Sequence, residues 1–145
     1  MTSTPDTIAR QCADALWASD NATRALGIEL VSVAQGRSQL SMPVRPDMTN
    51  GHGTCHGGFI FTLADSAFAF ACNTYDERTV AQHAQITFIA PGKSGDVLTA
   101  TAVERSRTGR SGIYDITVAR QDGTTIAEFR GSSRTIGGSI IQQAS

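Results

Sequence analysis

The feature that most constrains this sequence is the segment from Phe59 to Cys72, because it is apolar on almost every side. Its length of about four turns predicts one helix, interrupted only by Thr62, Asp65 and Ser66. A helix that is hydrophobic all round must be buried all round. One face of a flat sheet cannot achieve this, so we expect that the sheet curves around the helix or that a second subunit covers the rest.

Strand-like patterns lie on both sides of this helix, where apolar and polar residues alternate. The links between the later segments carry turn signals, such as Asp122-Gly123, which suits a tight hairpin. Short links predict antiparallel neighbours. Pro43 predicts that the second strand is an edge strand or ends early. The expected strands cover residues 28–33, 38–44, 79–90, 96–107, 112–121 and 124–136.

The length of 145 residues predicts a single domain covering residues 1–145. Residues 1–26 are expected to form an N-terminal helical segment, in which Thr7 can cap the first helix. Residues 139–145 are expected to be a flexible tail. The order of elements is typical of an α+β architecture in which an antiparallel sheet wraps one helix.

Composition and charge exclude several classes of function. The net charge is −1 and the basic residues form no run, so we expect no nucleic-acid partner. The longest apolar segment is too short to span a bilayer and contains Asp65, so no membrane partner is expected. The N-terminus lacks the uninterrupted apolar stretch of a signal peptide. The 3 cysteines are widely spaced and fit free thiols, which predicts a cytoplasmic protein.

Asp65 is the first candidate for chemistry, because an ionised carboxylate is costly to bury within an apolar helix. One interpretation is structural, with the carboxylate accepting hydrogen bonds from a neighbouring loop. The functional interpretation is a nucleophile or general base whose pKa is raised by its apolar surroundings.

Gly57 and Gly58 stand at the predicted start of the same helix, where backbone N–H groups lack intrahelical partners and the helix dipole is positive. Such a position can serve as an oxyanion hole, although glycine can also simply provide a flexible turn. Asn50 could orient an attacking water or hold a carbonyl. His56 could hydrogen-bond the substrate or order the loop, and His52 is expected to be structural or solvated.

The spacing of Gly57 and Asp65 leads to a stronger prediction. They are separated by eight residues, or roughly 12 Å along a helix axis, whereas both must lie within about 3 Å of one reacting centre. One helix therefore cannot supply both groups to one substrate. If both are catalytic, the protein is a dimer with two equivalent sites across a two-fold axis.

Two other groups of residues give weaker indications of a functional site. His52, Cys55 and His56 could bind a metal, but no fourth ligand is evident, so we expect no metal site. Cys55 could be a nucleophile paired with a histidine, although its neighbour His56 need not face it. The nucleophile elbow of serine hydrolases and the glycine-rich phosphate-binding motifs are absent.

The segment from Asn50 to Asp65 resembles a known signature. Asn50-Gly51-His52, followed by Cys55-His56-Gly57-Gly58-Phe59-Ile60-Phe61-Thr62-Leu63-Ala64-Asp65, is similar to the N-x(5)-HGGxxFxLAD pattern of hotdog-fold acyl-CoA thioesterases, and most closely to the phenylacetic acid degradation thioesterases, the PaaI family. The similarity extends to Ile136-Gly137-Gly138 and covers most of the chain.

This resemblance implies a hotdog fold, dimers that pair into a homotetramer, and hydrolysis of acyl-CoA thioesters without metal or cofactor. Phenylacetyl-CoA and ring-hydroxylated phenylacetyl-CoA are the implied substrates. The resemblance also implies that Asp65 is the catalytic carboxylate, Gly57 the oxyanion amide, Asn50 the residue that positions water or carbonyl, and His56 a neighbour of the thioester. It leaves open whether Asp65 activates water or attacks directly to give a mixed anhydride.

Some assignments stay open at this stage. Side chains such as Phe61, Phe68 and Phe88 are expected to shape the acyl pocket. The main alternative to an enzyme is a non-catalytic module that binds acyl-CoA or acyl-carrier protein, and a dehydratase is a closer enzymatic alternative. Further substrate-binding candidates, any of which could instead be an ordinary helix-start or solvated turn residue, are Gly58, Lys93, Arg105, Arg107 and Arg110.

Overall fold

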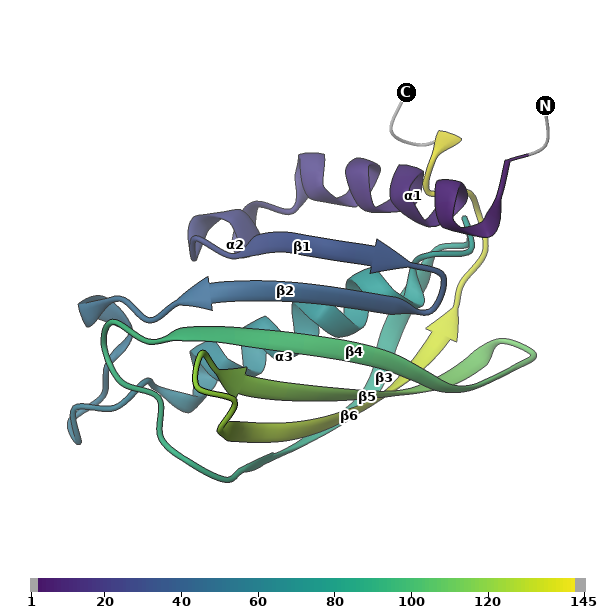
Figure 1. Cartoon of the computed structure of the whole chain (residues 1–145). Coiled ribbons are helices and arrows are strands. Elements are labelled where there is room, and N and C mark those ends of the chain that lie inside the picture. Colours follow the sequence, from purple (N-terminus) through teal and green to yellow (C-terminus); the bar gives the residue numbers. More distant parts are fainter. Residues whose placement is uncertain (1–2, 143–145) are drawn as a thin grey trace.

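The computed structural model describes residues 3–142. Over this range, 6 strands form one antiparallel sheet in the order β1-β2-β4-β5-β6-β3 (Figure 1). Each strand begins and ends within two residues of its predicted position. The elements are α1 (Pro5–Ser19), α2 (Asn21–Ala25), β1 (Glu29–Ala34), β2 (Arg37–Pro43), a 3-10 turn (Pro46–Met48), α3 (Gly57–Cys72), β3 (Thr79–Phe88), β4 (Val97–Thr108), β5 (Ser111–Arg120) and β6 (Thr125–Thr135).

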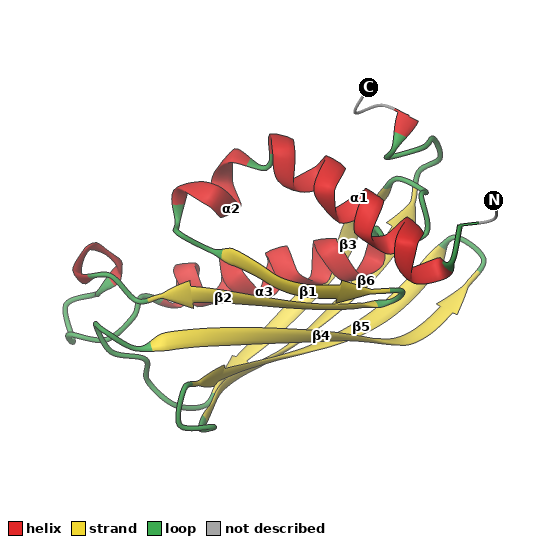
Figure 2. Cartoon of the chain, turned by 45° about the horizontal axis from the view of Figure 1, so that its top comes forward, coloured by secondary structure: helices red, strands yellow, loops and turns green. Residues whose placement is uncertain are grey.

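Helix α3 lies against the inner face of the curved sheet, as Figure 2 shows. Phe68 of this helix is buried against the sheet, where its ring packs at a tilt against Tyr114 and Phe129 at centroid distances of 5.6 and 6.0 Å. The sheet nevertheless leaves one side of the helix partly or fully exposed. This open stripe, at helical spacing, consists of Gly58, Phe61, Thr62, Asp65 and Ala69. The expected curvature of the sheet is confirmed, and one chain does not bury the helix completely.

The sheet order corrects one prediction and decides between the two alternatives of another. β3 does not pair with β4, which follows it along the chain, but lies at the opposite edge beside β6. Three strand spacings, roughly 14 Å, separate them, and the eight residues 89–96 can reach roughly 26 Å when extended, so the link crosses the end of the sheet. β2 ends at Pro43, as one of the two alternatives predicted, but it is an interior strand between β1 and β4.

The cap of the first helix also differs from the prediction. Thr4 caps α1, because its Oγ1 accepts a hydrogen bond of 3.1 Å from the backbone N–H of Thr7. Pro5 occupies the first helical position, where a missing N–H does no harm. Within the described residues, no helix is long and apolar enough to cross a bilayer.

The start of the expected flexible tail is held in place. Asp76 Oδ1 accepts hydrogen bonds from Ser139 Oγ at 2.8 Å and from the backbone N–H groups of Ile140 and Ile141 at 2.9 Å each. Ile140 is buried. The segment therefore closes the fold instead of fraying there, and residues 143–145 lie outside the described residues.

The contact between α3 and β6 leads to a testable expectation. A Cβ added to Gly131 would stand 2.6 Å from Cε2 of Phe68, a side chain that is only 1% exposed. Gly131→Ala should therefore lower the free energy of unfolding by about 1–3 kcal/mol through overpacking, measured by urea denaturation. Gly51→Ala is the matched control, since no atom lies within 4 Å of its added Cβ. Equal stability of the two variants would contradict the tight packing of Phe68 on β6.

Candidate active site

Over the part of the chain that the structure describes, the N-terminus of α3 carries one backbone donor without an acceptor. His56 caps the helix: its Nδ1 accepts from Gly58 N at 2.9 Å, and its carbonyl oxygen accepts from Phe59 N at 3.0 Å. The N–H of Gly57 has no acceptor among the described residues. This N–H lies at the positive end of the helix dipole. It is thus available to a ligand, whereas the N–H of Gly58 is engaged by His56.

Asn50 is oriented by its own loop. Its Oδ1 accepts hydrogen bonds from His52 N at 2.9 Å and from Thr54 N and Oγ1 at 3.3 Å each. Backbone N–H groups can only donate, so they define which side-chain atom is the oxygen. The Nδ2 amide is left as the donor of Asn50, so this residue is suited to hold an oxygen atom of a substrate.

Asn50 and Gly57 meet in one pocket with a volume of about 450 Å³. Phe88, at the end of β3, lies against Gly57 so closely that a Cβ on Gly57 would be 2.9 Å from Cζ of the ring. Phe61 and Phe68, which were also expected to shape the acyl pocket, do not line it. The lining residues are Asn50, Thr54, Cys55, Gly57, Ile60, Phe88, Ile89, Ala90 and Pro91.

Asp65 does not line this pocket, since it lies two turns further along α3 on the open stripe. No hydrogen bond or ion pair to its carboxylate is found within residues 3–142. Burial raises the pKa of Asp65, and the charge of Asp20 raises it further. Within one chain the carboxylate and the Gly57 amide therefore remain apart, as the helix spacing predicts.

Sequence patterns did not reveal the polar contacts that join α2 to α3 beside Asp65. Asp20 caps α2 by accepting hydrogen bonds from Thr23 N at 3.0 Å and Thr23 Oγ1 at 2.6 Å. The hydroxyls of Thr23 and Ser66 lie 2.9 Å apart, both buried, and join α2 to α3 next to Asp65. The spacing of Asp20 and Thr23 is a visible capping signal, but the partner Ser66 is distant in sequence.

Comparison with known proteins identifies the family. The family model described as "Thioesterase superfamily" matches residues 52–127, which include the helix start, Asp65 and the pocket wall. The chain belongs to the thioesterase superfamily. Its relatives include acyl-coenzyme A thioesterase PaaI of Escherichia coli, 45% identical over 134 residues, with 92% of this chain and 96% of that protein covered. Human acyl-coenzyme A thioesterase 13 is 34% identical over 126 residues, with 83% of this chain and 89% of that protein covered.

Structural comparison agrees with this assignment. The structure of the E. coli PaaI protein from the phenylacetic acid degradation operon superimposes with a TM-score of 0.92 at 43% identity, covering 94% of this chain and 99% of that one. This agreement over nearly the full length confirms the predicted α+β hotdog fold of the thioesterase.

The cationic candidates of this thioesterase are divided between two ends of the sheet. Lys93 lies beside the pocket, where its backbone pairs with Thr54 of the Asn50 loop. The other candidates lie roughly 30 Å away along β4, near its hairpin with β5. Two of them are engaged, Arg105 with Asp115 at 2.8 Å and Arg107 with Glu77 at 3.6 Å. Within one chain, none of these three arginines lies at the pocket. They are Arg105, Arg107 and Arg110.

Cys55 of the thioesterase lines the pocket but is a poor nucleophile. Its Sγ lies 3.7 Å from the carbonyl oxygen of His56, and burial raises the pKa of its thiol. The Nδ1 atom of His56 is already bonded to Gly58 N, so it is not free to take a proton from the thiol. The geometry therefore disfavours the alternative in which Cys55 attacks the substrate.

The raised pKa of Asp65 predicts a pH-dependent stability difference. Below the ordinary pKa of 3.8 the carboxyl group is protonated in both the folded and the unfolded thioesterase. Above pH 3.8 the Asp65 carboxyl group ionises freely in the unfolded chain, while burial opposes its ionisation in the folded state. The free energy of unfolding of the wild type therefore falls as the pH rises. Asp65→Asn should therefore have the higher Tm at pH 7 and a vanishing advantage near pH 3. A difference in Tm that is constant with pH would contradict this.

Proposed function

We propose that this protein hydrolyses acyl-CoA thioesters to a free acid and coenzyme A, and that its substrates carry an arylacetyl group such as phenylacetyl or ring-hydroxylated phenylacetyl. The observation that carries the proposal is the Gly57 N–H, which is unpaired among the described residues and lies at a helix N-terminus in the same pocket as Asn50. The E. coli relative is named acyl-coenzyme A thioesterase PaaI, and the phenylacetic acid degradation operon encodes its structural counterpart. Both names support the substrate class.

The reaction follows from the donors in the pocket. The thioester carbonyl oxygen accepts a hydrogen bond from Gly57 N–H, which stabilises the negative charge that develops in the tetrahedral transition state. Asn50 Nδ2 donates to the same oxygen or holds the attacking water. His56 stands between the lining residues Cys55 and Gly57, where its Nδ1 fixes the helix start. The acyl group lies against Phe88 and the apolar wall from Ile89 to Pro91.

Asp65 of the partner subunit supplies the carboxylate. It removes a proton from water as the water attacks, or it attacks the thioester itself to form a mixed anhydride that water then hydrolyses. In both routes the C–S bond breaks and coenzyme A leaves. Single turnover in ¹⁸O-labelled water tests for direct attack: if water opens the anhydride at the Asp65 carbon, an unlabelled enzyme oxygen enters the acid and the label enters Asp65, which the general-base route never gives.

Two features of one chain support the required dimer. The open stripe of α3 carries Asp65 on its exposed side, and β3 is a sheet edge with unpaired backbone groups. Val80 is 44% exposed at one end of this edge, and Phe88 is 53% exposed at the other. Antiparallel pairing of two β3 edges covers both and brings the hairpin that carries Arg110 toward the partner's pocket. Two such dimers then form the homotetramer that the family resemblance implies.

The decisive test is release of free thiol from phenylacetyl-CoA by the purified protein. We expect turnover that saturates with substrate, together with a light-scattering mass of at least twice the 15.3 kDa of one chain. A module that only binds acyl-CoA would release no thiol. An active monomer would contradict the shared site while leaving the hydrolysis itself in place.

A further inference from the structure

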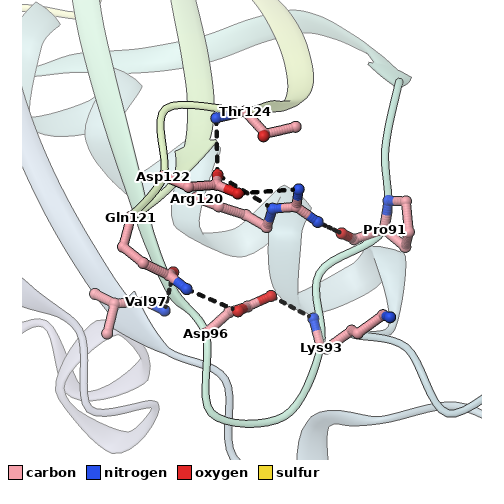
Figure 3. Close-up of polar contacts among 8 residues, drawn as sticks. All are labelled: Pro91, Lys93, Asp96, Val97, Arg120, Gln121, Asp122 and Thr124. Carbon is pink, nitrogen blue, oxygen red and sulfur yellow. Dashed lines mark hydrogen bonds and ion pairs between the residues drawn. The ribbon is translucent and has the colours of Figure 1, made fainter.

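One wall of the pocket is formed by the segment that leaves β3. The backbone N–H groups of Ile89 and Ala90 both donate to the carbonyl oxygen of Ile126, at 2.8 and 3.2 Å. Pro91, the next lining residue, has no N–H to donate. Its carbonyl oxygen instead accepts a hydrogen bond of 3.2 Å from Nη1 of Arg120 (Figure 3). A side chain from the end of β5 therefore fixes this part of the wall.

The Arg120 guanidinium is itself held in one orientation. Its Nε and Nη2 atoms lie 3.4 and 3.3 Å from the two carboxylate oxygens of Asp122, and the Arg120 side chain is 22% exposed. Asp122 Oδ1 also accepts from Thr124 N at 3.0 Å. These bonds come from the turn between β5 and β6. The arginine thus reaches the wall from a hydrogen-bonded turn and not as a free surface side chain.

The neighbouring residue Gln121 holds the same loop at a second place. Its Nε2 donates to Asp96 Oδ1 at 2.9 Å, and its Oε1 accepts from Val97 N at 3.0 Å (Figure 3). Asp96 Oδ2 in turn accepts from Lys93 N at 2.8 Å. Gln121 therefore fixes the far end of the loop, whereas the carbonyl of Pro91 depends on Arg120.

The loop also connects the two walls of the pocket. The carbonyl oxygen of Gly92 accepts a hydrogen bond of 2.7 Å from Cys55 N, so the residue after Pro91 is tied directly to the Asn50 loop. A displacement of Pro91 changes the distance between the walls. The Gly57 N–H is oriented by α3, whose start is capped by His56, so the oxyanion donor does not depend on the bond from Arg120 to Pro91.

We propose that Arg120 is a positioning residue that sets the width of the acyl pocket through its hydrogen bond to the carbonyl oxygen of Pro91. The inference rests on the proposed hydrolysis of acyl-CoA. It places selectivity for the acyl group partly in the β5–β6 turn, which contributes no lining side chain. An acyl group that fills the pocket contacts this wall, whereas a short acyl group does not reach it.

The test compares Arg120→Met, which keeps the apolar stem and removes the donors, with Arg120→Lys, which restores one donor. For phenylacetyl-CoA, Arg120→Met should raise KM by about tenfold, as for loss of one hydrogen bond from a charged group, with kcat within about threefold. For acetyl-CoA, KM should change less than twofold. Arg120→Lys should recover most of the affinity. Gln121→Met is the matched control, because it leaves the bond to Pro91 intact and should preserve the ratio of the two KM values.

Hydrogen exchange gives a readout that does not depend on turnover. In Arg120→Met, the segment 89–92 should exchange faster than in Gln121→Met, while α3 keeps its protection. Unchanged protection of that segment, or an equal rise of KM for both substrates, overturns the role of Arg120. A wild type that releases no thiol overturns the proposed function, and the exchange comparison still decides whether Arg120 holds the wall.

Discussion

Asp65→Asn should lower kcat for acyl-CoA hydrolysis by about a hundredfold or more, because a positioned base or nucleophile contributes at least this much. Asparagine keeps the size of the side chain but can neither accept a proton from water nor form an anhydride. KM should change little, since asparagine fills the same space beside the partner's pocket and leaves the Gly57 and Asn50 donors in place. The measurement is kcat together with sedimentation, which reports whether the variant remains assembled.

The matched control for this prediction is Asp14→Asn, which removes an exposed carboxylate that pairs with Arg10 on the surface of α1. Its kcat should equal that of the wild type. Residual turnover of Asp65→Asn should also lose the rise of kcat/KM with pH that a carboxylate base with a raised pKa produces. Near-normal kcat in a folded and assembled Asp65→Asn protein would remove this residue from the mechanism.

Gly57→Pro should lower kcat by about 10²–10³, the usual effect of removing one oxyanion donor. Proline is well tolerated at the first position of a helix. The preceding residue His56 has φ −60° and ψ 134°, a conformation that proline accepts at its N-terminal side. Gly57→Ala is the matched control, because it adds the same Cβ against Phe88 but retains the N–H. We expect Gly57→Ala to raise KM and to keep most of kcat.

A heterodimer of Gly57→Pro and Asp65→Ala extends this prediction to the assembly. If each site takes its amide from one chain and its carboxylate from the other, one site receives both defects and the second is intact. Mixing the two inactive proteins should then restore about half of the wild-type activity per heterodimer. Circular dichroism first verifies that both variants fold. If subunits exchange and no activity returns, amide and carboxylate come from one chain and the shared site is wrong.

Local patterns were sufficient for much of this protein. The apolar segment after Phe59, the alternating strands and the Asp122-Gly123 turn identified the elements, because helix and strand periodicity and turn chemistry depend on residues close in sequence. Residue type also selected Asp65 and Gly57, since a carboxylate in an apolar helix and glycine at its start are costly without a role. Their separation along one helix predicted that one chain keeps them apart, and it does.

Other features depend on contacts between residues far apart in the chain. The position of β3 beside β6 is not decided by the following loop, because its eight residues can reach a neighbouring strand or cross the end of the sheet. The choice of Gly57 over Gly58 as the free donor follows from the direction of the His56 ring. The bonds from Ser66 to Thr23 and from Arg120 to Pro91 join segments that no periodicity relates. In such contacts, each buried polar group bonds to one of several donors or acceptors near it. Which ones are near it is decided only when the chain has packed.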